Sequence, residues 1–344
     1  MRLDTPPRTL LVLGGGGAMG AYQAGALLAL ARSGVLPDAL FGCSAGGLNA
    51  AFFAVDPSVA RAEELRQWWL DRRTHSLLSA SWLARARGVA GALTTGRSGL
   101  FDAGPLRRLI AENVPAHDLC ELRIPLTVTT TCLDCAMARH HDRGSVIDIL
   151  TASCALPGLL PPVPLTCGPG RSGHLHVDGG VLCGVPLVAA LATAGPRDRV
   201  LVLDCGLAPV TSAPGGCAAY PAGAPALVEE ACGLVAIGGR SYVAPVESSR
   251  GAMDVVLRAF TAARAVANLA HVAPGLGDPR VRVLPHIADA WAAGVLDVLP
   301  EGPRDFRRTG DLAAAGASAT ERWLAGGGLE RASVVGSGDG IASA

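Results

Sequence analysis

One serine in this chain is flanked by glycines at the spacing of a nucleophile elbow. Residues 42–46 are Gly-Cys-Ser-Ala-Gly, a G-x-S-x-G pentapeptide between a short apolar run and a segment of small residues. Such a pentapeptide holds the serine on a tight turn between a strand and a helix, with its hydroxyl exposed. Chance matches are common in a chain rich in alanine and glycine, but the flanking pattern favours catalysis. Ser44 is therefore the candidate nucleophile, with Gly42 and Gly46 as supporting glycines.

A second glycine cluster precedes this serine and is compatible with two chemistries. Gly15, Gly16 and Gly17 belong to a run of four glycines, and Gly20 follows. In one interpretation, the backbone amides of this loop stabilise the oxyanion that forms when the serine attacks. In the other, the loop is a dinucleotide-binding G-x-G-x-x-G turn, which also requires an acidic residue at the end of the next strand. Asp38 precedes that strand, so the spacing favours an oxyanion loop.

Attack by a serine also requires a base. Asp178 ends an apolar run and is followed by Gly179 and Gly180, which would place its carboxylate on an open turn. Most Asp-Gly-Gly tripeptides are simply turns. His176 lies two residues earlier, so its side chain and that of Asp178 share one face of the predicted strand. The residues leave open a Ser-His-Asp relay and a carboxylate that acts without histidine.

The elements that must position these residues alternate between strands and helices. We expect a strand at 9–13, a helix at 21–32, a strand at 39–42 and a helix at 46–55, an order typical of an α/β fold with a parallel sheet. Further strands are expected at 124–132, 174–177, 200–204 and 281–284, and further helices at 146–154, 227–237, 255–269 and 311–324.

Taken in order, these motifs resemble those of the patatin-like phospholipases, a family of lipid acyl hydrolases. The matching blocks are Gly15–Gly20, Gly42–Gly46, Ala152–Gly158 with Pro161 and Pro162 behind it, and Asp178–Gly180; residues 305–324 resemble the closing helix of the family. The segment 152–158, Ala-Ser-Cys-Ala-Leu-Pro-Gly, is the most specific of these because no generic structural need explains it.

The resemblance implies a three-layer α/β/α fold with a mainly parallel central sheet. It also implies a Ser44–Asp178 dyad without histidine, with Gly15, Gly16 and Gly17 holding the oxyanion. The expected reaction is hydrolysis of a carboxylic ester of a lipid through an acyl-serine, without a cofactor. Many members have a basic residue where Met19 stands. Two rivals remain: a dinucleotide-dependent enzyme and a catalytically silent lipid-binding protein.

We expect one domain over residues 8–325, with the catalytic motifs within 14–180 and a C-terminal extension at 206–325. A glycine- and serine-rich tail at 326–344 is expected to be disordered.

Cys132 and Cys135 form a C-x-x-C pair that His140 and His141 follow. These residue types suit zinc. Cys132, however, ends a β-like run, and a second C-x-x-C pair is absent. We therefore expect buried thiols here and no metal site.

The net charge and the length of the apolar runs limit the classes of binding partner that we expect. A formal net charge of +0 gives no reason to expect nucleic acid. The apolar runs are too short to span a bilayer, and we see no secretory leader, so we expect a cytoplasmic protein with a lipid or other ester substrate and transient membrane contact. Trp68, Trp69 and Trp82 either pack in the core or form a lipid-contacting lid.

Overall fold

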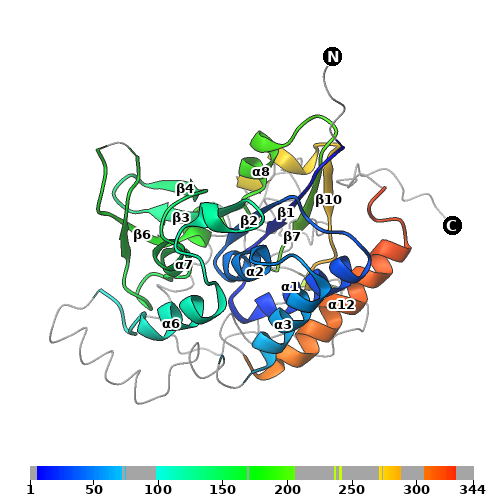
Figure 1. Ribbon diagram of the computed structural model, residues 1–344, viewed down its shortest axis with the longest axis horizontal. Coiled ribbons are helices and arrows are strands. Elements are labelled where there is room, and N and C mark those ends of the chain that lie inside the picture. Colours follow the sequence, from blue (N-terminus) through cyan, green and yellow to red (C-terminus); the bar gives the residue numbers. More distant parts are fainter. Residues whose placement is uncertain are drawn as a thin grey trace.

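The computed structural model describes residues 6–71, 74, 98–168, 170–205, 236–237, 240–241, 271–272, 274–287 and 306–330. Within these ranges the chain forms an eight-stranded sheet with helices packed on it (Figure 1). Strands β10, β7, β1, β2 and β3 lie side by side and are parallel. Strands β4, β5 and β6 add an antiparallel edge. The predicted α/β class with a mainly parallel central sheet is confirmed.

The bounds of the elements follow the expected order. The strands of the sheet are β1 (Thr9–Leu13), β2 (Ala39–Cys43), β3 (Leu126–Cys132), β4 (Met137–His141), β5 (Val163–Leu165), β6 (His174–Asp178), β7 (Arg199–Leu203) and β10 (Val281–Val283). The α-helices are α1 (Gly20–Arg32), α2 (Ala45–Ala54), α3 (Val59–Leu70), α6 (Gly104–Asn113), α7 (Val146–Ser153), α8 (Leu187–Thr193) and α12 (Thr309–Ala325). Short 3-10 helices are η1 (Gly17–Met19), η2 (Leu119–Glu121), η3 (Gly179–Val181) and η4 (Phe306–Arg308).

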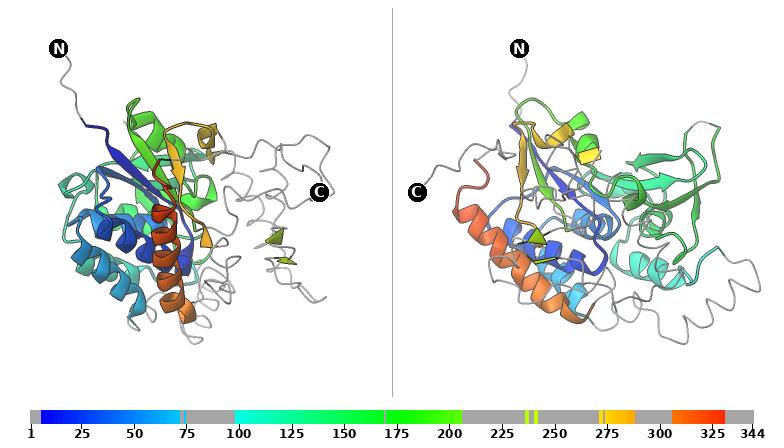
Figure 2. Two further views of the ribbon diagram at one scale, coloured as in Figure 1. Left: turned by 90° about the vertical axis from the view of Figure 1, so that its right-hand side faces the viewer. Right: turned by 180° about the vertical axis from the view of Figure 1, so that it is seen from behind.

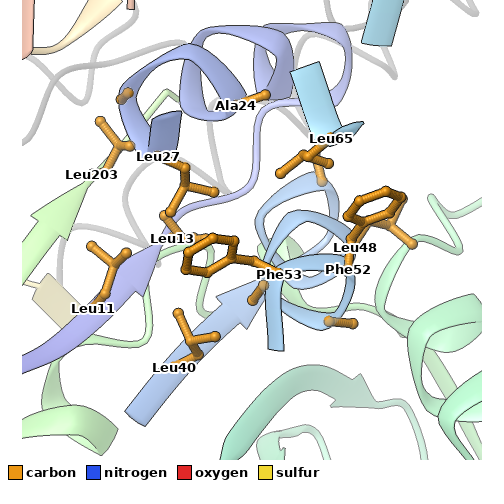
Figure 3. Packing of buried hydrophobic residues seen from close by; sticks show 14 of the residues in the cluster. Leu11, Leu13, Ala24, Leu27, Leu40, Leu48, Phe52, Phe53, Leu65 and Leu203 are labelled. Atoms are coloured by element: carbon orange, nitrogen blue, oxygen red, sulfur yellow. The ribbon is translucent and has the colours of Figure 1, made fainter. Parts of the chain in front are cut away.

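Helices cover both faces of the sheet. Successive side chains of a strand point to opposite sides, so a buried strand contributes apolar residues to both faces. Leu11 and Leu13 of β1 belong to a large core cluster with residues of α1, α2 and α3 (Figure 3), and residues of α12 belong to the same cluster. Leu10 and Val12 of the same strand belong to a second cluster with residues of α8. Helices α1, α3 and α12 pack together on the first face (Figures 1 and 2). The sheet is thus the middle layer between helices.

The register along β3 positions the ends of two other strands. Strand β2 pairs with the first four residues of β3, and β6 pairs with the last three. Strand β4 pairs with β3 over both stretches and so occupies the opposite edge. Strands β2 and β6 therefore share one edge of β3 and meet with their C-terminal ends. Cys43 is opposite Thr129, and Asp178 is opposite Thr130.

One predicted helix is wrong where the structure describes it. In place of the end of a helix at 227–237, residues Ala236–Ile237 form β8, which pairs with β9 (Arg240–Ser241). Two glycines separate these strands in the sequence, and Gly-Gly is a strong hairpin signal. The predicted helix at 255–269, Trp82 and the tail beyond residue 330 lie outside the described residues. Residues 326–330 form a turn after α12.

A search of the described helices for a stretch long and apolar enough to cross a membrane finds none.

Candidate active site

Ser44 occupies the turn between β2 and α2, where the sequence predicts a nucleophile elbow. Its backbone has a positive φ, with φ 53° and ψ −124°. Residues other than glycine rarely adopt such a conformation. Such strain persists only where the surrounding structure enforces it, and it is characteristic of functional sites. The chain is crowded here, since a Cβ added at Gly46 would lie 2.2 Å from the carbonyl oxygen of Leu13. Only glycine lets α2 begin so close to the end of β1.

The Ser44 hydroxyl donates a hydrogen bond to Asp178 Oδ2 at 2.8 Å. The second carboxylate oxygen, Oδ1, accepts the Gly180 amide at 2.7 Å, and the Asp178 amide donates to the carbonyl oxygen of Ala155 at 2.9 Å. Asp178 is 1% exposed. A Cβ at Gly179 would lie 2.4 Å from the Thr129 carbonyl oxygen, so the tight turn after Asp178 excludes a side chain. One carboxylate oxygen is thus fixed by the backbone, and the other faces the serine.

Ser153, at the end of α7, connects the elbow to the sheet. Its Oγ accepts the Ser44 amide at 2.8 Å and donates to the Thr129 carbonyl oxygen at 2.7 Å. Ser153 is fully buried. The sequence singled out the segment 152–158 without assigning a role to any of its residues. The structure shows that Ser153 supports the strained backbone of Ser44.

The glycine loop after β1 lies against the serine. A Cβ added at Gly15 would be 3.3 Å from Ser44 Cβ. The Gly15 amide, however, donates to the carbonyl oxygen of Gly184 at 2.9 Å. In the part of the chain that the structure describes, the amides of Gly16 and Gly17 have no hydrogen-bond acceptor. Three amides were expected to bind an oxyanion. The Gly15 amide is already hydrogen-bonded, so the amides of Gly16 and Gly17 are the two that remain available.

A buried network that sequence reasoning missed holds this loop in place. Trp69 Nε1 donates to Asn49 Oδ1 at 2.7 Å, and Asn49 Nδ2 donates to Gln23 Oε1 and to the Gly20 carbonyl oxygen, both at 2.9 Å. Gln23 Nε2 donates to the carbonyl oxygen of Gly14 at 2.8 Å. The network ties α3, α2 and α1 to the start of the glycine loop. Gln23 and Asn49, two polar residues within the predicted helices at 21–32 and 46–55, were the available signal.

This network also decides between the two expectations for Trp69. Trp69 is 1% exposed and donates a hydrogen bond inside the core. Trp68 is partly buried and packs on Trp69, with ring centroids 5.1 Å apart. A lipid-contacting lid built on Trp69 is excluded. Met19 is likewise 1% exposed and packs in the core.

His176 does not lie between the serine and the aspartate. Its Nδ1 is 2.8 Å from the hydroxyl of Thr130, which is also 2.8 Å from Nε2 of His141. Among the described atoms, Nε2 of His176 has no hydrogen-bond partner. Burial lowers the pKa of His176 to about 4. The hydrogen bond between Ser44 and Asp178 is direct, and no imidazole lies between the two side chains.

A thiol lies beside this contact. Cys154 interacts with the Ser44 hydroxyl, and burial together with the negative charge of Asp178 raises the pKa of the thiol far above its ordinary value. The thiolate, not the thiol, is the reactive form of cysteine. Cys154 is therefore held in its unreactive thiol form beside the Ser44 hydroxyl.

The C-x-x-C pair and the two histidines that were considered together for zinc have different partners in the structure. The hydroxyls of Thr129 and Thr130 contact His140 Nδ1 at 2.9 Å and His141 Nε2 at 2.8 Å. The C-x-x-C pair at 132 and 135 instead meets Cys167 and His174, which sequence reasoning did not consider. The sequence does contain a signal for these two residues. Cys167 and His174 flank a glycine-rich segment just before and at the start of the predicted strand at 174–177.

Several known proteins are similar to this chain. The family model described as Patatin-like phospholipase matches residues 11–191. Patatin-like phospholipase domain-containing protein 7 of Mus musculus is 30% identical over 205 residues, 60% of this chain and 14% of that protein. Neuropathy target esterase sws of Drosophila sechellia is 28% identical over 176 residues, 51% of this chain and 11% of that protein. The crystal structure of VipD from Legionella pneumophila aligns with a TM-score of 0.41 and 15% identity, covering 93% of this chain and 67% of that one. The chain thus spans at most 14% of the length of these two relatives.

Proposed function

The chain belongs to the patatin-like phospholipase family, and on that premise we propose that it hydrolyses carboxylic esters of lipids through a Ser44–Asp178 dyad. The observation that supports this proposal most directly is the 2.8 Å hydrogen bond from the Ser44 hydroxyl to Asp178 Oδ2. A serine hydroxyl becomes a competent nucleophile only when a positioned base accepts its proton. Asp178 is buried and held by backbone amide and carbonyl groups, so it is preorganised for that role.

In the first half of the reaction, Ser44 Oγ forms a bond to the ester carbonyl carbon while its proton passes to Asp178. The amides of Gly16 and Gly17 stabilise the resulting oxyanion, assisted by the N-terminus of α2. The tetrahedral intermediate collapses, the C–O bond to the alcohol breaks, and Asp178 returns the proton to the leaving alkoxide. An acyl-serine and a free alcohol remain.

In the second half, water attacks the acyl-serine. Asp178 accepts a proton from the water, and the same amides stabilise the second oxyanion. When this intermediate collapses, the carboxylic acid leaves, and Ser44 Oγ recovers its proton from Asp178. The cycle balances without a histidine. The names of the family and of the two relatives above favour a phospholipid or a related lipid ester as substrate.

Covalent labelling with a fluorophosphonate probe tests the nucleophile. We expect the wild type to be labelled at Ser44, Ser44→Ala to be unlabelled, and Ser33→Ala, at an exposed serine, to be labelled normally. Hydrolysis of phosphatidylcholine in mixed micelles is then measured for the same variants.

The two rival functions predict different outcomes. A dinucleotide-dependent enzyme would bind nucleotide and lose no activity on Ser44→Ala. A silent lipid-binding protein would bind vesicles but leave the probe unreacted when correctly folded. Absence of label on folded wild-type protein contradicts the proposed hydrolase.

A further inference from the structure

Four metal-binding side chains converge at the antiparallel edge of the sheet, outside the proposed active site. They come from two hairpins: Cys132 ends β3, Cys135 lies in the turn before β4, Cys167 follows β5, and His174 begins β6. One ligand atom from each lies within 4.8 Å of the others. We call these four residues the Cys3His cluster.

The distances within the cluster resemble the edges of a zinc coordination tetrahedron. Zn–S bonds of about 2.3 Å and Zn–N bonds of about 2.0 Å give edges of roughly 3.5 to 3.8 Å. Cys135 Sγ is 3.3 Å from Cys167 Sγ and 3.4 Å from His174 Nδ1. Cys132 Sγ is 3.6 Å from the same His174 nitrogen. Small side-chain movements would bring all four atoms to one central ion.

Ordinary core packing does not account for these thiols. Cys132 is fully buried and Cys167 is 8% exposed, yet neither belongs to the two hydrophobic core clusters. Leu133, in the β3–β4 turn, and Met137, the first residue of β4, are 49% and 52% exposed. With these two large apolar side chains exposed, a bound metal would add stability to this end of the sheet.

The charges around the cluster fit a bound cation with thiolate ligands. Zinc with three thiolates and one neutral imidazole carries a net charge of −1. Arg171 Nη1 lies 3.8 Å from Cys135 Sγ, and Arg139 also interacts with this sulfur. The two guanidinium groups, which contact a ligand sulfur and not the metal, would offset the excess negative charge.

We propose that the Cys3His cluster is a structural zinc site that joins the β3–β4 turn to the β5–β6 loop. Three sulfurs and one nitrogen in tetrahedral reach select zinc over magnesium or calcium. Four protein ligands leave no open position for substrate. His174 and Asp178 are the two ends of β6, about 13 Å apart along the strand, so the metal stabilises the strand without touching the reaction.

Metal analysis of the purified full chain tests this proposal independently of catalysis. The protein is prepared in reducing buffer without added metal, and its zinc is measured by inductively coupled plasma mass spectrometry. We expect one zinc per chain in the wild type and at least a tenfold loss in Cys135→Ser and in Cys167→Ser. Cys120→Ser is the matched control, because Cys120 is exposed and lies outside the cluster, and it should retain the metal.

X-ray absorption of the wild type keeps the test decisive if a variant fails to fold. The zinc edge should show a shell of three sulfurs and one nitrogen, and Co²⁺-substituted protein should show the intense visible bands of tetrahedral thiolate coordination. Wild-type protein without zinc contradicts the proposal. So does zinc that persists in both cluster variants, or a disulfide between Cys135 and Cys167 in non-reducing peptide maps. None of these outcomes depends on Ser44 activity, so this proposal and the proposed function can fail separately.

Discussion

Ser44 and Asp178 are 134 residues apart in the sequence and one hydrogen bond apart in space, because β2 and β6 end head to head on the same edge of β3. Strand β2 ends opposite Thr129, and β6 ends opposite Thr130, the next residue on β3. The candidate nucleophile and its base are therefore aligned by the sheet itself and not by a mobile loop.

Replacement of Asp178 by asparagine should abolish most of the activity while replacement of His176 should not. Asparagine keeps the shape of the side chain but cannot accept the serine proton, and a general base contributes typically about 10²- to 10⁴-fold. We expect kcat of Asp178→Asn to fall by that range, and His176→Gln to retain kcat within a few-fold. Steady-state hydrolysis of a lipid ester measures both; an equal loss in the two variants would indicate a histidine relay.

Replacement of Ser153 by alanine should reduce turnover without removing any reacting group. The Ser44 amide would lose its acceptor, which destabilises the strained elbow by about 1 to 3 kcal/mol. Misplacement of the nucleophile should lower kcat by roughly 10- to 100-fold with KM nearly unchanged. Urea unfolding and steady-state kinetics test the two effects. If Ser153→Ala has normal kcat, the elbow does not need this hydroxyl.

Replacement of Asn49 by leucine should destabilise the protein. Trp69 Nε1 would lose its Asn49 acceptor and the Gln23 oxygen would lose its Asn49 donor, and the loss of a buried hydrogen-bond partner costs about 1 to 3 kcal/mol. We expect the free energy of unfolding to fall by roughly 2 to 5 kcal/mol. Asn113→Ala, at a partly exposed asparagine, should change it by less than about 1 kcal/mol. A small effect at Asn49 would mean that the network is replaced by water.

The stability of the protein should fall as the pH decreases from about 6.5 to about 4. Burial lowers the pKa of His141 from 6.5 to about 4. Over that interval the unfolded chain binds a proton at this position and the folded chain does not, so acid favours unfolding. The contribution, on the order of 3 kcal/mol, is complete above pH 6.5 and is lost as the pH falls to 4. Urea unfolding at several pH values should show a shallower slope for His141→Gln than for the exposed control His117→Gln. Equal slopes would place the acid sensitivity elsewhere.

Much of the fold and the main features of the site could be predicted because local sequence encodes them. The pentapeptide at 42–46 requires a strand, a tight turn and a helix, and the observed β2 and α2 differ from the expected bounds by one residue. The end of β6 at Asp178 follows from an apolar run that stops at two glycines.

What could not be predicted depends on strand pairing between distant segments. The Gly15 amide donates a hydrogen bond to the carbonyl oxygen of Gly184 because two loops that are distant in the sequence meet there. The meeting of the C-x-x-C pair with Cys167 and His174 likewise requires β5 to pair with β6, and β6 with β3. No local spacing indicates these partners, because each register is set by the assembled sheet.

The pairing of β6 with β3 also makes the carboxylate sensitive to insertions and deletions. A slip of one residue along β3 would turn Asp178 to the opposite face of the sheet and bring the apolar side chain of Val177 toward the serine. A change in loop length between β5 and β6 can therefore be tolerated only if the loop absorbs it entirely, whereas a single residue inserted within β6 would silence the enzyme without altering either reacting side chain.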